Sequence, residues 1–204
     1  MPRKTNDGYA VLARSELPVD TVELARYLIG KVVVRTTSKG VLSGRIVETE
    51  AYPVGDAAGH AYRGETARNR ALFLRPGHAY VYLAYGVSWM LNVSSEAAGV
   101  GAGVLIRALA PLEGIATMQR NRGVETLRDL ARGPGRLAVA LDIDHRLDGI
   151  DLCRRGPLWL ARDSGDTLEL ATSTRIGLSR EADRRLRFYL RGDRFVSGTK
   201  ALNR

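Results

Sequence analysis

The order of strand-like and helix-like segments is the feature that most limits what this chain can fold into. Runs typical of strands cover residues 31–35, 41–52, 77–84, 88–94, 104–108 and 188–191. Segments typical of helices cover residues 20–29, 66–74 and 111–123, and another follows residue 134. Because strands and helices do not alternate, the pattern predicts an α+β fold with a largely antiparallel sheet rather than a doubly wound one.

The chain is long enough for one domain, and nothing in it suggests a division into two. It has 204 residues, of which 45% are hydrophobic, and it contains no internal repeat and no long linker. We therefore expect a flexible N-terminal segment over residues 1–16 and a single compact domain over residues 17–204. The expected domain has a curved sheet, surrounding helices and a protruding β-hairpin.

The charge of the chain points to a polyanionic partner. The formal net charge is +9, and nearly all of the positive charge is arginine. Such a charge favours a nucleic acid or an acidic membrane surface as the partner. No apolar run approaches the length of a membrane helix, and the first residues lack the apolar core of a signal peptide. We expect no membrane association, and a cytoplasmic, nucleoid-associated protein in a prokaryote or a nuclear one in a eukaryote.

Cysteine and histidine are too sparse to suggest a metal or redox centre. Cys153 is the only cysteine, which excludes a disulfide framework and a cysteine-based zinc site. The three histidines, His60, His78 and His145, are far apart in the sequence and show no helical ligand spacing. We therefore expect neither a metal nor another cofactor.

The segment GRIVETEAY over residues 44–52 places acidic side chains within an apolar strand. Because alternate residues of a strand share a face, Glu48, Glu50 and Tyr52 are expected to point the same way. Two carboxylates on such a face are costly to bury without a purpose, which favours a functional site. The alternative is a solvated outer face that carries a cross-strand salt bridge.

A tyrosine-rich hairpin is predicted over residues 80–93. Tyr80 and Tyr82 share one strand face, whereas Tyr85 lies with Gly86 in the turn. An aromatic residue at an exposed tip is a poor core residue, but it can insert between stacked bases. For Tyr80 and Tyr82 the alternative is ordinary core packing.

Arg107 interrupts the apolar strand VLIRAL. A buried arginine needs a carboxylate or a phosphate as its partner, and Glu50 is one candidate. The alternative is an edge strand on which Arg107 points into water.

The order of these motifs resembles one known family. ETEAY is followed by a histidine, RNR, PGHAYVYLAYG, an asparagine on the returning strand, RALAPLEG and a GP pair. This arrangement resembles the alkyladenine (3-methyladenine) DNA glycosylase family over residues 17 to 197. The last motif, RFYLRG over residues 187–192, fits the C-terminal end of that family.

The resemblance implies roles for the two charged residues and the aromatic walls. Glu50 corresponds to the general base that activates the attacking water, and Arg107 to the partner that helps to hold it. Tyr52 and Tyr82 correspond to the two aromatic walls of the base pocket.

Four further roles follow from the same resemblance. His60 would contact the edge of the base, and Asn92 would disfavour the exocyclic amine of normal guanine. Ile176 matches a later piece of the pocket, and Tyr85 corresponds to the wedge that fills the gap left by a flipped nucleotide. The loop between Tyr52 and His60 is one residue shorter than in the familiar form of the family, which bears on the placement of His60.

The activity that the resemblance implies is hydrolysis of the N-glycosidic bond of alkylated or deaminated purines flipped out of duplex DNA. No lysine lies near the motifs, so a Schiff-base lyase step is not expected and the enzyme would be monofunctional. The expected partner is double-stranded DNA with a damaged purine, bound by a monomer. Two alternatives are a non-enzymatic binder of damaged or single-stranded nucleic acid and a hydrolase of free nucleosides.

Overall fold

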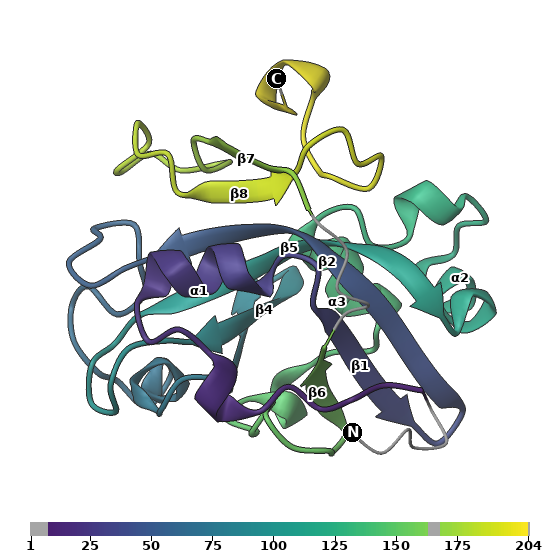
Figure 1. Ribbon diagram of the computed structural model, residues 1–204, viewed down its shortest axis with the longest axis horizontal. Helices are drawn as coiled ribbons and strands as arrows, with labels where there is room; N and C mark the ends of the chain where they lie inside the picture. The colour runs from purple at the N-terminus through teal and green to yellow at the C-terminus, as the bar shows by residue number, and fades with distance from the viewer. Residues whose placement is uncertain (1–7, 163–167, 204) are drawn as a thin grey trace.

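A computed structural model of the chain describes residues 8–162 and 168–203. The described residues form an antiparallel sheet whose central path has the order β3-β4-β5-β2-β1-β6, with β8 paired to β2 and β7 paired to β8. The strands are β1 (Val32–Thr37), β2 (Gly40–Tyr52), β3 (Ala79–Ala84), β4 (Ser88–Ser94), β5 (Gly103–Glu113), β6 (Leu158–Ala161), β7 (Leu170–Ser173) and β8 (Arg187–Leu190). The predicted α+β class with a curved, largely antiparallel sheet is confirmed (Figure 1).

Helices and short turns surround this sheet. The α-helices are α1 (Thr21–Leu28), α2 (Ile115–Arg122) and α3 (Pro134–Ala140), and the 3-10 turns are η1 (Arg14–Glu16), η2 (Arg70–Phe73), η3 (Leu127–Asp129), η4 (His145–Leu147) and η5 (Lys200–Asn203). Helix α1 begins where expected, because the Asp20 carboxylate accepts hydrogen bonds from the amides of Val22 and Glu23. The helix packs against β2, where the Thr49 hydroxyl donates a hydrogen bond to the Ala25 carbonyl.

Strand β2 is the longest strand of the sheet and has neighbours on both edges along much of its length. It pairs with β5 on one edge, and on the other with β1 near its beginning and with β8 at residues 48–50. Figure 1 shows β8 lying along β2, with β7 and the C-terminus above them. The alternate residues Val47, Thr49 and Ala51 face the core on the α1 side and have no exposed surface. On the opposite face, the Glu48 and Glu50 side chains accept hydrogen bonds from the amides of Ser197 and Ile176.

Two of the expected helices differ from the structure, each for a local reason. Residues 66–74 do not form an α-helix, because Asn69 accepts hydrogen bonds from the Thr66 amide and hydroxyl and closes a turn. Pro111 does not open a helix but lies in β5, opposite Gly44 next to a register shift, where its missing N–H is tolerated. Helix α2 begins after Gly114, whose φ of 76° reverses the chain direction.

The expectation of a flexible segment over residues 1–16 does not hold for residues 8–16. The Leu12 amide donates a hydrogen bond to the Leu160 carbonyl on β6, and the Leu12 side chain has no exposed surface. Residues 1–7 lie outside the described residues.

Candidate active site

Two carboxylates on β2 are enclosed by the strands that flank it. Glu48 and Glu50 both have no exposed surface. They share a face, as the alternation predicts, and β5 and β8 pair with β2 on either side of them. The alternative of a solvated outer face is therefore wrong for this part of β2.

Glu50 is held by three donors from three segments of the chain. Its Oε1 accepts a hydrogen bond of 2.8 Å from the Ile176 amide. Its Oε2 accepts one of 3.0 Å from the Tyr52 hydroxyl and lies 3.2 Å from Arg107 Nη1. Arg107 is thus the buried partner of Glu50 and not an edge residue in water. Burial and the neighbouring Glu50 charge raise the pKa of Tyr52, which keeps the phenol protonated as a donor.

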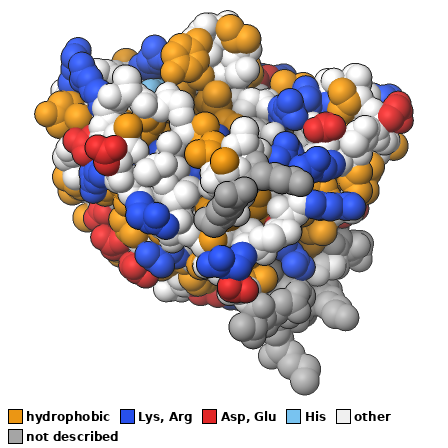
Figure 2. Space-filling model, turned by 90° about the horizontal axis from the view of Figure 1, so that it is seen from above, with side chains coloured by type: hydrophobic (Ala, Val, Ile, Leu, Met, Phe, Trp, Pro, Cys, Tyr) orange, Lys and Arg blue, Asp and Glu red, His pale blue; other side chains and the backbone are white. Residues whose placement is uncertain are grey.

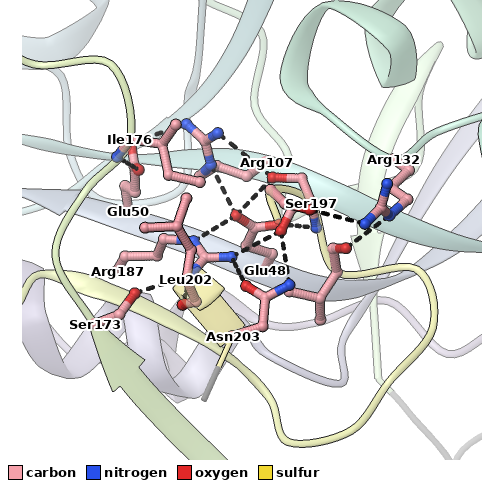
Figure 3. A network of polar contacts seen from close by, with 12 residues as sticks. Glu48, Glu50, Arg107, Arg132, Ser173, Ile176, Arg187, Ser197, Leu202 and Asn203 are labelled. Carbon is pink, nitrogen blue, oxygen red and sulfur yellow. Dashed lines mark hydrogen bonds and ion pairs between the residues drawn. The ribbon is translucent and has the colours of Figure 1, made fainter. Parts of the chain in front are cut away.

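Glu48 has more partners and lies at the centre of a larger network (Figure 3). Its Oε1 lies 2.9 Å from Arg107 Nε, 2.7 Å from Arg187 Nε and 2.8 Å from the Ser197 hydroxyl. Its Oε2 accepts a hydrogen bond of 2.6 Å from the Ser197 amide. Burial acts to raise the pKa of Glu48, but the guanidinium groups of Arg107 and Arg187 hold it below the usual value.

The two carboxylates differ in how much acceptor capacity is left. A carboxylate has about four lone-pair sites. Glu48 accepts from four donors, three of them on Oε1, whereas Glu50 accepts from three, with only the Ile176 amide on Oε1. Glu50 therefore keeps one acceptor site for a further donor such as water.

A pocket with a volume of about 160 Å³ opens beside Tyr52. Aromatic side chains form much of its wall. The rings of Tyr80 and Tyr82 stack with centroids 5.2 Å apart, and the His60 ring lies 4.3 Å from that of Tyr82. Tyr52 lines the pocket and also bonds to Glu50, so it joins the pocket to the buried carboxylates. Tyr82 lines this pocket, as the resemblance implied, and Tyr80 lines it too although its side chain is almost fully buried.

His60 is fixed in the pocket wall by residues whose roles the sequence reasoning did not identify. Its Nδ1 lies 2.9 Å from the Tyr80 hydroxyl. Its carbonyl accepts a hydrogen bond of 2.9 Å from Asn69, the asparagine of the RNR motif. Partial burial and the charge of Arg68 lower the pKa of His60, which favours the neutral ring.

Asn92 and Ile176 play different parts in the site. Asn92 lines the pocket, and its side-chain amide donates a hydrogen bond of 3.1 Å to the Tyr80 carbonyl. Ile176 was expected to belong to the pocket, but among the described residues it is the neighbouring Leu178 that lines it. The contribution of Ile176 is its backbone amide, which bonds to Glu50.

A buried ion pair that the sequence reasoning missed fixes the loop after β2. Arg175 contacts Asp56 at 2.5 Å, and both side chains have no exposed surface. The guanidinium lies 4.6 Å from the centroid of the Tyr52 ring and donates to the Ala51 carbonyl. Arg175 thus holds Tyr52 from behind and also anchors Ile176, the next residue. The one sequence signal for this ion pair is that Asp56 follows the ETEAY motif by four residues, and nothing in the sequence indicates Arg175 as its partner.

Tyr85 lies at the tip of the hairpin formed by β3 and β4, as predicted. Its side chain is 94% exposed, and its φ of 51° is in the left-handed region. That conformation is uncommon for a residue other than glycine and costs about 1–2 kcal/mol. Val87, on the other side of Gly86, is 81% exposed. Tyr85 also lines the mouth of the pocket together with Tyr80 and Tyr82, so one hairpin supplies both the exposed tip and part of the pocket wall.

The surface charges do not mark a binding face as clearly as the pocket marks a binding site. Figure 2 shows Lys and Arg side chains spread over the face above β7 and β8, mixed with acidic and apolar ones. Within residues 8–162 and 168–203, no three His, Cys, Asp or Glu side chains are grouped so that they could hold a metal ion. The helices in this part of the chain are too short or too polar to cross a membrane.

The chain is similar to known proteins of one family. A family model described as methylpurine-DNA glycosylase (MPG) matches residues 15–194. A protein of Mesorhizobium japonicum is 70% identical over 196 residues, which cover 96% of this chain and 94% of the relative. Relatives from Paraburkholderia phytofirmans and Methanoculleus marisnigri are 52% and 45% identical, over 94% and 87% of this chain and 90% and 94% of their own lengths. All three carry the name "Putative 3-methyladenine DNA glycosylase". The chain therefore belongs to the methylpurine-DNA glycosylase family.

Proposed function

We propose that this DNA glycosylase flips alkylated or deaminated purines out of duplex DNA and hydrolyses their N-glycosidic bond. One observation carries the proposal. A carboxylate paired with arginine, Glu50, lies directly behind an aromatic pocket, and the hairpin that lines the pocket also presents the exposed Tyr85.

The pocket suits a purine that has left the base stack. A base inside a duplex is out of reach, and extruding it costs a few kcal/mol. Stacking on aromatic side chains recovers about 1–3 kcal/mol for each base, and here Tyr52 and Tyr82 supply the rings. Because an alkylated purine carries positive charge, aromatic faces favour it further. Tyr85 would fill the gap that the base leaves in the stack.

Glu50 would then act on the glycosidic bond in two ways. Its remaining acceptor site takes a proton from the attacking water, and its charge stabilises the oxocarbenium ion that develops on the sugar. Glu50 has no exposed surface, so water reaches it only after Tyr52 or the loop behind it shifts as the base enters. Hydrogen bonds that tighten only in the substrate complex are common in enzymes.

The reaction would end at an abasic site. A lyase step needs an amine that can form a Schiff base with the sugar. No lysine is among the pocket-lining residues in the described part of the chain. We therefore propose a monofunctional enzyme that acts as a monomer on double-stranded DNA.

Release of single damaged bases tests the proposal. Duplexes with one methyladenine, methylguanine, hypoxanthine or ethenoadenine are incubated with an excess of the protein, and free base and abasic sites are counted. We expect release of a methylated purine, and a loss of about 10²–10⁴-fold in Glu50→Gln with binding to the damaged duplex retained. A protein that binds the damaged duplex but releases no base from any of them would be the non-enzymatic binder instead.

The salt dependence of the same reaction separates a DNA enzyme from a hydrolase of free nucleosides. Binding to duplex DNA releases counterions, so its affinity falls steeply between about 50 and 200 mM salt. We expect the rate at limiting DNA concentration to fall with it. A rate that does not change with salt, together with cleavage of free nucleosides, would support the nucleoside hydrolase.

A further inference from the structure

Glu48 is the more heavily bonded of the two buried carboxylates, yet the chemistry proposed above does not use it. It has no exposed surface, and it accepts from four donors, three of them on Oε1. The guanidinium groups of Arg107 and Arg187 hold its pKa below the usual value, which makes it a poor acceptor of a proton from water. It is connected to the proposed catalytic residue through Arg107, which contacts both Glu48 and Glu50.

The geometry of Arg107 shows what this link does. One guanidinium edge, Nε, donates to Glu48 at 2.9 Å, and another nitrogen, Nη1, lies 3.2 Å from Glu50. The planar guanidinium presents its donors in a fixed fork, so fixing one nitrogen fixes the direction of the others. The bond to Glu48 therefore determines where Arg107 meets Glu50.

Charge gives Glu48 a second effect. The two carboxylates and the guanidinium groups of Arg107 and Arg187 form a buried set with no net charge. If Glu48 lost its charge, Glu50 would be the only anion beside the two guanidinium groups. The four side chains would then carry a net positive charge. A positive set beside a developing oxocarbenium ion opposes the reaction.

The rest of the network holds Glu48 itself. Arg187 donates to Glu48 at 2.7 Å, and it is in turn bonded to the Ser197 carbonyl at 3.0 Å and the Asn203 side chain at 2.7 Å. Ser197 adds its amide and hydroxyl to the same carboxylate. Figure 3 shows these groups converging on Glu48 from β5, β8 and the C-terminal segment.

We propose that Glu48 is the positioning residue of the active site, which, held by Arg187 and Ser197, aims Arg107 at Glu50 and balances the charge around it. The inference rests on the proposed function, because it assigns Glu48 a part in base release. Segments distant in sequence, β2, β5, β8 and residues 197–203, would thus set the geometry of one catalytic carboxylate. A shift of 1 Å in such a group can cost about 10²-fold in rate.

The test compares Glu48→Gln with the wild type in single-turnover release of a methylated purine. Glu48→Gln keeps the shape and removes the charge. We expect the rate to fall by about 10²-fold, while affinity for a duplex with a tetrahydrofuran abasic-site analogue changes less than threefold. A rate within threefold of the wild type would overturn the proposal. If the wild type itself releases no base, the proposed function fails instead.

A double-mutant cycle separates positioning from a loosened fold. If Glu48 acts through Arg107, Glu48→Gln should cost less than threefold when added to Arg107→Ala, because residues that act as a unit are not additive. A full and independent loss in that background would show a merely structural role and overturn the proposal.

Arg132 offers a matched control within the same C-terminal segment. It donates to the carbonyls of Val196 and Gly198 and, within the described residues, forms neither a hydrogen bond nor an ion pair with Glu48 or Glu50. Arg132→Ala should loosen that segment yet release base at nearly the wild-type rate. A loss equal to that of Glu48→Gln would assign the effect to the segment.

Ser197→Ala carries the test if Glu48→Gln does not fold. It removes one hydroxyl donor from Glu48, together with the acceptor of a 3.4 Å hydrogen bond from Arg107 Nη2, and leaves every charge in place. We expect a loss of about three- to tenfold that disappears in the Arg107→Ala background. A rate equal to that of the wild type would overturn the proposal.

Discussion

The carboxylate network and the hairpin tip are two regions of the site with opposite and uncommon burial. Charged side chains are usually exposed and large aromatic ones usually buried, whereas here the reverse holds. The network places Glu48 and Glu50 in the interior without any exposed surface. The tip places an aromatic ring, Tyr85, in solvent with 94% of its surface exposed and a φ of 51°. One region buries charge, whereas the other exposes apolar surface on strained backbone.

Neither arrangement is explained by folding stability. Transferring a carboxylate into the interior costs several kcal/mol, which pairing with arginine only partly offsets. A tyrosine with positive φ in solvent adds strain and buries little. We infer that the network serves chemistry, where fixed charge matters, and that the tip serves contact with a partner. Changes in the network should therefore affect stability and rate together, and changes at the tip should affect binding of the base alone.

Arg107→Ala should have the largest effect, because it removes the cation that both carboxylates share. We expect base release to fall by at least about 10²-fold, since a buried carboxylate without a cation favours the protonated form, which cannot take a proton from water. The free energy of unfolding should fall by about 3–5 kcal/mol. Single-turnover release and urea unfolding measure the two quantities.

The variant Arg107→Lys separates the effect of charge from the effect of geometry. Lysine keeps a charge but lacks the fork that reaches both carboxylates, so the comparison weighs geometry against charge. A variant Arg107→Ala that keeps its stability but loses its activity would show that the network is less coupled to the fold than its burial implies.

Much of this contrast could be predicted from the sequence. Alternation along β2 placed Glu48, Glu50 and Tyr52 on one face, and the out-of-phase Tyr85 was expected at a hairpin tip. Such features are local, because the strand period and the turn chemistry fix them within a few residues.

The remaining parts of the site depend on contacts between distant segments. Arg187 and Ser197 lie more than 130 residues from Glu48, and the pair Asp56 and Arg175 is separated by 119 residues. No periodicity encodes such a contact. The role of Ile176 was missed for another reason, because its amide is a backbone group whose position is independent of side-chain type.

Tyr85→Ala should have a smaller effect that is confined to the duplex. Because the side chain is almost fully exposed, the free energy of unfolding should change by less than about 0.5 kcal/mol. The flipped population at a paired site should fall by the worth of one stacking contact, about 1–3 kcal/mol. A fluorescent base analogue reports flipping, and the loss should shrink at mismatched sites, where extrusion is cheaper. Equal flipping amplitudes at a paired site would rule out the wedge.

Asn92→Ser should give the smallest effect, and a gain instead of a loss. Asn92 reaches the pocket from β4, beside Tyr80 on β3, so its side chain occupies space that a bound purine would approach. Serine is shorter and would leave room for the exocyclic amine of guanine. We expect release of undamaged guanine from a mismatched site to rise up to about tenfold, worth about 1.4 kcal/mol. The lost hydrogen bond to the Tyr80 carbonyl should cost about 1 kcal/mol of stability.

Release of a methylated adenine serves as the control and should change little, because that base lacks the amine at this position. If guanine release stays at the wild-type level while the control is normal, the pocket excludes guanine by another group, and the discrimination belongs to the aromatic wall.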